Sequence, residues 1–213
     1  MQDLAQIRKE YTLLSLDEKS ISPSPFQQFE KWFNEALTAK VLEPNAMNLA
    51  TVSENGRPSS RIVLLKGFDE QGFIFFTNYQ SNKGKDLEQN PFCSLSFFWP
   101  ELERQVRIEG SAGKIPTDQS DAYFNSRPRE SQIGAWASPQ SSVIASRIII
   151  EERYNSIEKK FEGEKSITRP NQWGGYITKP FLIEFWQGRH SRLHDRIQYT
   201  LVDGPWKINR LAP

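Results

Sequence analysis

The sequence predicts a mainly antiparallel β protein with added helices, of a β-barrel type. Roughly seven or eight short runs have the alternation and the β-branched or aromatic content of strands. Turn signals such as Asn55-Gly56 separate them, and strand patterns lie on both sides of a helical stretch. We therefore expect a single domain over residues 25–213, with a helical insert at about 117–163, preceded by an N-terminal arm over residues 1–24.

The first expected element after the arm is a helix that follows Ser22-Pro23-Ser24-Pro25. Ser24 is suited to the N-cap, Pro25 to the first helical position, and Gln27 to the second half of a capping box. The helical spacing predicts a buried stripe made of four apolar side chains, Phe26, Phe29, Phe33 and Leu37.

Strand patterns begin at Ala46. Asn55-Gly56 is the strongest short hairpin signal and joins the first two expected strands. A short helix is expected over 83–89, before Pro91. The strands expected in this half are 46–53, 59–66, 73–78, 92–99 and 105–114.

The second half begins with helical patterns. One covers 117–136, and a longer one places Ile150, Tyr154, Ile157 and Phe161 on one stripe, with Gly163 as its stop. The strands expected after them are 175–177, 183–187, 192–202 and 206–211.

Composition excludes several classes of function. The net charge of +1, from 27 basic and 26 acidic side chains, does not suit a protein that coats nucleic acid. One cysteine, Cys93, excludes an intrachain disulfide, and with two histidines no metal site is expected. The N-terminus has no apolar signal core, and no apolar run suits a membrane helix, so a cytoplasmic protein without a membrane partner is expected.

The most informative stretch is Trp186–Ile197. If its second half is a strand, Arg192, His194 and Arg196 share one face. Such a row of cations is repulsive unless an anion or an electron-rich ligand lies over it. The alternative is the solvated face of an antiparallel strand.

Three further groups suit anions. Arg61 and Lys66 have opposite strand parity, so one site can use both only at a bulge, a strand end or an interface. Lys83 lies at an expected helix N-terminus, which favours phosphate, although a solvated loop explains it equally well. Tyr123, Arg127 and Ser131 suit an ester phosphate, or form a charge cluster at a helix C-terminus. Because motifs for nucleophilic, dinucleotide or zinc chemistry are absent, an organic cofactor is expected to supply the chemistry.

A set of motifs in order resembles the pyridoxine/pyridoxamine 5′-phosphate oxidase family over nearly the whole chain, from Arg8-Lys-Glu-Tyr11 to Arg210-Leu-Ala-Pro213. The motifs between these ends are Arg61-Ile-Val-Leu-Leu-Lys66, Glu103-Arg-Gln-Val106, Ser126-Arg-Pro-Arg129, Ser131-Gln-Ile-Gly-Ala-Trp136, Trp173-Gly-Gly175, Glu184-Phe-Trp-Gln-Gly188 and Arg192-Leu-His-Asp-Arg196.

The resemblance implies an FMN-binding split β-barrel that forms a homodimer, with each FMN at the subunit interface. Its reaction would oxidise pyridoxamine 5′-phosphate or pyridoxine 5′-phosphate to pyridoxal 5′-phosphate by hydride transfer to the flavin. Oxygen would be the electron acceptor and hydrogen peroxide a product, with ammonia released from the amine.

The resemblance also implies roles for single residues. Arg192 and His194 would be catalytic and lie over the substrate ring, and Arg8 and Tyr11 resemble the family's mobile N-terminal cover. The substrate would be bound by Arg8, Tyr11, Lys66, Tyr123, Arg127, Ser131, Arg192 and His194. FMN would be bound by Arg61, Ile62, Val63, Leu64, Leu65, Lys66, Phe76, Thr77, Asn82, Lys83, Gln105, Gln140, Ser141, Trp186 and Arg196.

Four of these cofactor residues, Gln140, Ser141, Trp186 and Arg196, would come from the partner subunit. Asn82 stands where the family usually has arginine, so it lacks a charged two-pronged grip on phosphate. Phe76 would contribute only through its backbone.

Two alternatives remain from the sequence. One is another FMN split-barrel oxidoreductase with a different substrate. The other is a non-catalytic barrel that binds a flavin, pyridoxal phosphate or single-stranded nucleic acid, since six tryptophans and clustered arginines suit base stacking.

Overall fold

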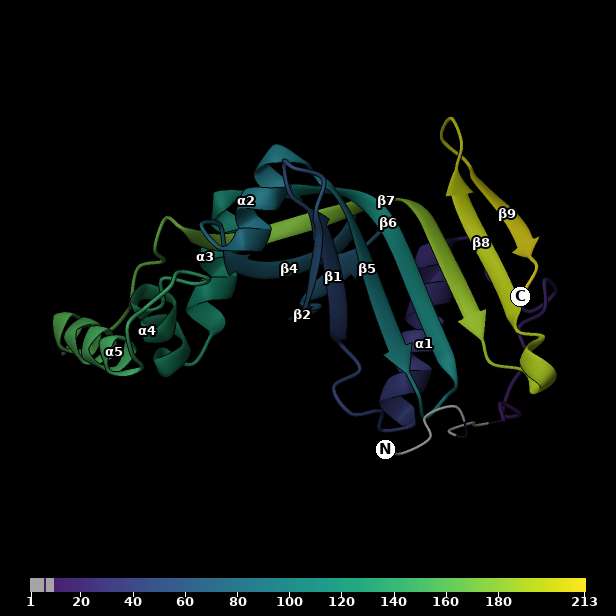
Figure 1. Cartoon of the computed structure of the whole chain (residues 1–213), viewed down its shortest axis with the longest axis horizontal. Coiled ribbons are helices and arrows are strands. Elements are labelled where there is room, and N and C mark those ends of the chain that lie inside the picture. The colour runs from purple at the N-terminus through teal and green to yellow at the C-terminus, as the bar shows by residue number, and fades with distance from the viewer. Residues whose placement is uncertain (1–5, 7–9) are drawn as a thin grey trace. The chain divides into compact units, whose positions relative to one another are not determined.

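The computed structural model describes Gln6 and residues 10–213. Within them lies a nine-stranded sheet in the order β2-β1-β5-β6-β7-β4-β3, with β8 paired to β7 and β9 paired to β8 (Figure 1). The strands are β1 (Ala46–Val52), β2 (Pro58–Leu64), β3 (Gly67–Asp69), β4 (Gly72–Asn78), β5 (Phe92–Trp99), β6 (Arg104–Lys114), β7 (Trp173–Gln187), β8 (Asp195–Leu201) and β9 (Trp206–Leu211).

Five α-helices and a short 3-10 helix accompany the sheet in the described part of the chain. They are α1 (Pro25–Thr38), α2 (Asn82–Gln89), α3 (Thr117–Ser126), α4 (Arg129–Ala137), α5 (Ile148–Lys160) and η2 (His190–Arg192). The β3–β4, β4–β7, β7–β8 and β8–β9 pairs are all antiparallel. The predicted class, mainly antiparallel β with added helices, is therefore confirmed.

The chain divides into two compact units. Unit 1 comprises the described part of 1–49 together with 94–110 and 180–213, and unit 2 comprises 50–93 and 111–179. Each unit is thus built from segments that are distant in the sequence.

The core of unit 1 forms between α1 and its strands. Phe29 and Trp32 are buried, and their rings lie 5.2 Å from those of Phe97 and Phe185 respectively. Burial of side chains of this size contributes about 1.5–3 kcal/mol each. The predicted stripe was wrong at Leu37, which is 52% exposed, because the helix turns Trp32 and Ala36 inward instead.

The start of α1 is only partly as predicted. Ser24 is the N-cap and Pro25 the first helical residue, but no side-chain cap bond forms, so the capping box with Gln27 was wrong. The next residue, Gln28, is buried and its Oε1 accepts a hydrogen bond from the Ser22 N–H at 3.0 Å.

Strand β7 is one continuous strand, where two were expected. Pro180 lies within this strand, although proline cannot donate to a strand ladder. The structure accommodates it because residues 173–178 pair with β4 and residues 182–187 pair with β8. Pro180 lies between these two ladders and removes a hydrogen bond from neither.

In unit 2 the expected helix over 117–136 is two helices, α3 and α4. The break lies at Arg127, which has extended dihedrals (φ −77°, ψ 150°) because it precedes Pro128. Helices α4 and α5 lie side by side (Figure 1). Their core contains Phe124, Ile133, Phe161 and Trp173, and the helix stop predicted at Gly163 has φ 78°.

No helix among the described residues combines the length and the apolar character that crossing a membrane requires. In the same part of the chain, no group of three or more histidine, cysteine or acidic side chains is arranged to hold a metal ion.

Candidate functional site

Unit 2 contains a cavity of about 490 Å³, which is lined by many of the residues predicted to bind FMN or the substrate. It lies where β2 ends and where β4, α2, α3 and α4 approach one another. The predicted residues that line it are Ile62, Val63, Leu64, Lys66, Phe76, Thr77, Lys83, Tyr123, Arg127, Ser131 and Gln140. Pro128 and Trp173 also line it and were not predicted, although Trp173 belongs to a motif of the sequence.

Lys83 is the buried cation of this pocket. It lies in the first turn of α2, and its Nζ donates to Thr77 Oγ1 (3.2 Å), Gln140 Oε1 (3.1 Å) and Ser81 Oγ (3.4 Å). All three acceptors are neutral, and no described carboxylate forms an ion pair with this ammonium. Burial, and then the charge of Arg61, lower the pKa of Lys83. An anion in the pocket would offset this cost.

Arg61 lies near Lys83 and is held by Thr51 and Asp86. Its Nη1 donates to Thr51 Oγ1 at 2.7 Å, and its Nη2 lies 3.9 Å from Asp86 Oδ2. Thr51 Oγ1 in turn donates to Asp86 Oδ2 at 2.6 Å. The sequence analysis missed Asp86, although it lies three residues after Lys83 and therefore on a neighbouring part of the same helix surface.

Lys66 resolves the parity problem that the sequence posed. Strand β2 ends at Leu64, so Lys66 lies beyond the strand, where its backbone N–H donates to Ile74 O at 2.8 Å. The alternation of a regular strand therefore does not apply to it. Lys66 lines the pocket, whereas Arg61 remains on the strand.

The other end of the pocket is aromatic and cationic. The Tyr123 ring stacks on Phe76 at 3.9 Å, and the Arg127 guanidinium lies 4.6 Å from the centre of the Trp173 ring. Arg127 Nη1 is buried and has no hydrogen-bond partner among the described residues. Burial lowers the pKa of Arg127, an effect that Tyr123 opposes.

This unpaired donor indicates a missing acceptor. An unsatisfied buried polar group costs about 1–3 kcal/mol, and more when it is charged. Ser131, in the first turn of α4, lines the same cavity and offers a hydroxyl. A ligand oxygen at this end would satisfy the guanidinium.

The prediction for the Arg192–Ile197 stretch was wrong in its geometry. Strand β8 begins only at Asp195, and Arg192 ends the 3-10 helix η2. Ser191 and Arg192 both have left-handed backbone, with φ 54° and 61°. Arg192, His194 and Arg196 therefore do not form one row of a regular strand.

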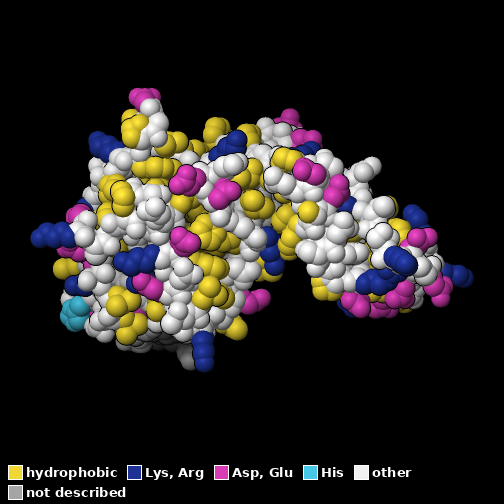
Figure 2. Space-filling view, turned by 180° about the vertical axis from the view of Figure 1, so that it is seen from behind, with side chains coloured by type: hydrophobic (Ala, Val, Ile, Leu, Met, Phe, Trp, Pro, Cys, Tyr) yellow, Lys and Arg dark blue, Asp and Glu magenta, His cyan; other side chains and the backbone are white. Residues whose placement is uncertain are grey.

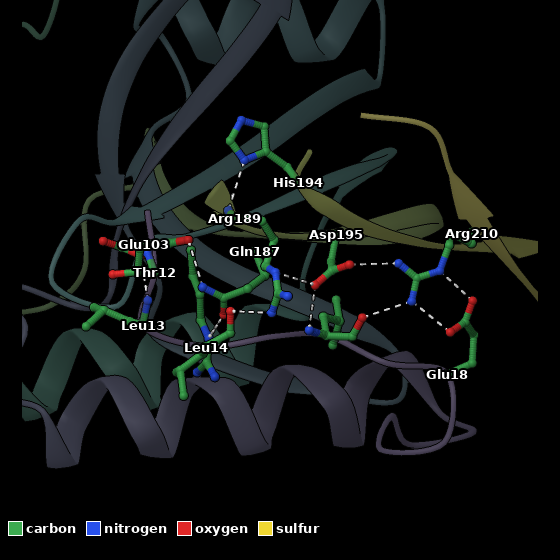
Figure 3. A network of polar contacts seen from close by, with 12 residues as sticks. Thr12, Leu13, Leu14, Glu18, Glu103, Gln187, Arg189, His194, Asp195 and Arg210 are labelled. Atoms are coloured by element: carbon green, nitrogen blue, oxygen red, sulfur yellow. Dashed lines mark hydrogen bonds and ion pairs between the residues drawn. The ribbon is translucent and has the colours of Figure 1, made fainter. Parts of the chain in front are cut away.

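His194 is nevertheless part of an aromatic cluster in unit 1. Its ring lies 4.6 Å from Trp186 and 5.9 Å from Tyr11. The Arg189 backbone N–H donates to His194 Nδ1 at 3.1 Å (Figure 3). In the neutral imidazole the proton therefore resides on Nε2, which is free to act as a donor. Burial, and then Arg192, lower the pKa of His194.

Arg196 is anchored by Glu184, which the sequence analysis quotes in a motif but to which it gives no role. Its Nε and Nη2 donate to Glu184 Oε1 (2.8 Å) and Oε2 (3.1 Å), and its Nη1 donates to Ala212 O (2.8 Å). Glu184 is 3% exposed and also accepts from Arg107. It raises the pKa of Arg196. Its position two residues before Trp186 on a strand was the available signal.

Several predicted residues do not line the pocket. Leu65 is buried in the core, while Asn82 and Ser141 are exposed. Gln105 is half-buried on β6 and, like Trp186, Arg192, His194 and Arg196, belongs to unit 1. Arg8 lies outside the described residues.

Gln140 lies in the pocket of its own chain. Its Oε1 accepts hydrogen bonds from Thr77 Oγ1 (3.0 Å) and Lys83 Nζ (3.1 Å). These contacts form because the segment after α4 returns toward α2. The contribution of the partner subunit's copy of Gln140 to the cofactor stays a prediction.

The charge on one face of the molecule does not favour the nucleic-acid alternative. On the face shown in Figure 2, Lys and Arg side chains are interspersed with Asp and Glu. A single-strand binder instead needs a positively charged groove that follows the phosphate backbone.

Two family models together match most of the chain. Residues 33–161 match the family model described as pyridoxamine 5′-phosphate oxidase. Residues 173–213 match the pyridoxine 5′-phosphate oxidase C-terminal dimerisation region. The first range contains the pocket, apart from Trp173, and the second contains His194 and Arg196.

Individual proteins agree with this. The pyridoxine/pyridoxamine 5′-phosphate oxidase of Burkholderia ambifaria is 57% identical over 216 residues, which cover 100% of both chains. The protein of the same name from Cytophaga hutchinsonii is 56% identical over 212 residues, 99% of each chain.

Two solved structures are similar in fold. PhzG from Burkholderia lata 383, crystallised with tetrahydrophenazine-1-carboxylic acid, has a TM-score of 0.89 and 28% identity, over 96% of this chain and 100% of that one. A pyridoxamine 5′-phosphate oxidase-related, FMN binding protein from Nostoc punctiforme has a TM-score of 0.70 and 19% identity, over 91% and 100%, and supports the fold alone. The predicted split-barrel fold is thereby confirmed, and the chain belongs to the pyridoxamine 5′-phosphate oxidase family.

Proposed function

We propose that this chain binds FMN and oxidises pyridoxamine 5′-phosphate or pyridoxine 5′-phosphate to pyridoxal 5′-phosphate. Two electrons leave carbon 4′ of the substrate and pass to oxygen, which becomes hydrogen peroxide. The alcohol gives the aldehyde directly, whereas the amine also takes up water and releases ammonia. The names of relatives that are more than 50% identical over their full length support this reaction.

The observation that carries the proposal is the presence, in one cavity, of two cations that have no acidic partner among the described residues. Lys83 has only neutral acceptors, and the buried Nη1 of Arg127 has none among the described residues. A pocket for two phosphate esters, one on the cofactor and one on the substrate, would use both.

The residues present fit FMN. The cavity of about 490 Å³ lies within the ~300–1,000 Å³ typical of small-molecule sites. Lys83 and Thr77, at the start of α2 and the end of β4, would bind the phosphate end, with Arg61 held nearby by Thr51 and Asp86. When bound, FMN supplies the two-electron acceptor that no side chain of the protein provides.

The substrate phosphate would be bound by Lys66, Tyr123, Arg127 and Ser131, all of which line the cavity. Guanidinium and ammonium groups give charge-assisted bonds to phosphate, and the two hydroxyls add neutral donors. His194, neutral and protonated at Nε2, would donate to the substrate ring, and Arg192 would hold the ring in place.

A homodimer would complete the site. Residues 173–213 match a dimerisation region, and they contain Trp186, Arg192, His194 and Arg196. We propose that the partner subunit contributes Trp186 and Arg196 to the cofactor. Ser141, which is exposed beside the pocket residue Gln140, would join them.

A cytoplasmic location remains a prediction. Cys93 is buried, lies 3.6 Å from Thr178 Oγ1, and has a pKa raised by burial. A thiol in this environment is protonated and unreactive, so it neither requires nor reports a particular redox compartment.

The first test is anaerobic reduction of the purified protein. Pyridoxine 5′-phosphate should bleach the visible absorbance of the flavin, and admitting oxygen should restore it with formation of hydrogen peroxide. Arg127→Gln should raise the KM for the phosphorylated substrate, whereas Arg147→Gln, an exposed arginine paired with Glu151, should not. A flavin that resists bleaching would contradict this reaction and leave either a non-catalytic carrier or an oxidase of a different substrate.

A second candidate function is a flavin oxidase with a different substrate. The similarity to PhzG, which was crystallised in complex with tetrahydrophenazine-1-carboxylic acid, a compound without a phosphate group, favours it. Turnover of pyridoxine with and without its 5′-phosphate separates the two. If the phosphate makes no difference, Arg127 does not bind it and the second candidate is preferred.

A further inference from the structure

The N-terminal segment, residues 11–18, is fastened to unit 1 by side chains from four distant places. Leu16 N–H donates to Asp195 Oδ2 at 3.0 Å, and Arg189 Nη1 donates to Leu14 O at 3.3 Å (Figure 3). Arg210 pairs with Glu18 and holds the pKa of that carboxyl at about 2. The fourth anchor is Glu103, which binds the two residues that directly follow Tyr11.

Glu103 lies in the turn between β5 and β6, has left-handed backbone (φ 55°), and is 2% exposed. Its Oε2 accepts hydrogen bonds from the backbone N–H groups of Thr12 (2.9 Å) and Leu13 (3.1 Å). These charge-assisted bonds fix the two residues that directly follow Tyr11.

The backbone of Glu103 binds a second segment, the end of β7 and the glycine that follows it. Its carbonyl oxygen accepts from Gly188 N–H (2.7 Å) and from Gln187 Nε2 (3.2 Å) (Figure 3). One residue therefore holds both the N-terminal segment and the end of β7, directly after Trp186.

Tyr11 fills the space between these two segments. Its ring meets Trp186 edge-on at 5.8 Å and His194 at 5.9 Å. A Cβ at Gly188 would lie 2.7 Å from Tyr11 Cγ and 3.1 Å from Glu103 Cβ. Only glycine lets the tyrosine and the glutamate pack this closely against the bend.

We propose that Glu103 is a positioning residue for the substrate ring. Its carboxylate fixes the N-terminal segment so that Tyr11 completes an aromatic wall with Trp186 and His194. This inference rests on the proposed function where it concerns the substrate, but the anchoring itself does not.

Amide hydrogen exchange on the ligand-free protein tests the anchoring. In Glu103→Ala and Glu103→Gln the amides of Thr12 and Leu13 should exchange faster than in the wild type. The matched control is Glu101→Gln in the same turn, an exposed residue whose carboxylate accepts a long hydrogen bond, 3.5 Å, from the Leu42 N–H. Exchange that is unchanged in the Glu103 variants overturns the proposal.

Steady-state kinetics test the positioning. Glu103→Gln keeps a neutral acceptor, so the KM for pyridoxine 5′-phosphate should rise about fivefold, with kcat and FMN content nearly unchanged. In a Tyr11→Leu background, Glu103→Gln should add no further increase. The same increase in both backgrounds, or a parallel loss of FMN, would show a general structural role and overturn the proposal.

The two sets of results also separate this proposal from the proposed function. If the wild type does not oxidise pyridoxine 5′-phosphate, the proposed function fails. Amide exchange at Thr12 and Leu13 still decides whether Glu103 holds the segment.

Discussion

Replacing Lys83 with methionine should weaken FMN binding without destabilising the flavin-free protein. The side chain is 9% exposed, and among the described residues its ammonium donates to Thr77, Ser81 and Gln140. Methionine keeps the length and the apolar stem of lysine but removes the charge. The substitution therefore isolates the electrostatic contribution.

The magnitude follows from the contact that would be lost. A hydrogen bond to a charged group is worth about 1.5–3 kcal/mol, which corresponds to an increase of about 10- to 150-fold in the Kd for FMN. The flavin-free protein should be at least as stable as the wild type. Burial lowers the pKa of Lys83, so below that pKa the fold holds a charge that it disfavours.

Quenching of flavin fluorescence on titration with the flavin-free protein gives the Kd, and thermal unfolding gives the stability. Lys85→Met is the matched control, because Lys85 is an exposed lysine on the same helix. Riboflavin, which lacks the phosphate, should bind both variants equally. If Lys83→Met weakens riboflavin as much as FMN, the ammonium does not contact the phosphate.

Two other predictions concern the pKa of His194 and the effect of alanine at Gly84 compared with Gly134. NMR titration of the imidazole should place the pKa of His194 below the usual value, because burial and Arg192 lower it, and Arg192→Gln should raise it. The neutral ring is thus favoured at neutral pH. The stability that the neutral ring confers is lost as the pH falls from the pKa of the unfolded state toward the lower pKa of the folded state. A pKa of His194 that Arg192→Gln leaves unchanged would contradict the role given to Arg192. Gly84→Ala should lower the free energy of unfolding by about 1–3 kcal/mol, because its Cβ would overlap the Tyr79 carbonyl. Gly134→Ala, in open space on α4, should instead raise it by about 0.5–1 kcal/mol, and equal effects would refute the steric argument.

The sequence predicts elements well where local signals decide. Asn55-Gly56 forms the β1–β2 turn with Gly56 at φ 73°, and Ser24-Pro25 begins α1. Such signals depend on the conformational preferences of a few adjacent residues. The predicted strand bounds mostly agree with the structure within two residues for the same reason.

The failures lie where distant residues decide. Strand β7 continues through Pro180 because two different partner strands pair with its two halves. The left-handed residues Ser191 and Arg192 interrupt an alternating pattern that otherwise suits a strand. No local pattern reveals either arrangement.

The pocket shows the same division. Residues such as Lys83 and Tyr123 could be given roles from the resemblance to a family. The ion pairs of Asp86 with Arg61 and of Glu184 with Arg196 could not be predicted, although Glu184 lies in a quoted motif, because helix and strand positions distant in the chain bring each pair together. Residue type and spacing identify the cations of a site but not the carboxylates that restrain them.

Whether a carboxylate already pairs with a cation predicts how much that cation contributes to FMN affinity. Arg196 already donates twice to Glu184, a buried carboxylate, so a phosphate nearby gains less from it. Lys83 has no carboxylate partner among the described residues, so its charge is not already offset by an ion pair there. Lys83→Met should therefore cost more FMN affinity than Arg196→Met in the same fluorescence titration. The opposite order would mean that the Glu184 pair opens when FMN binds, and that the ligand-free contacts do not measure what each cation contributes.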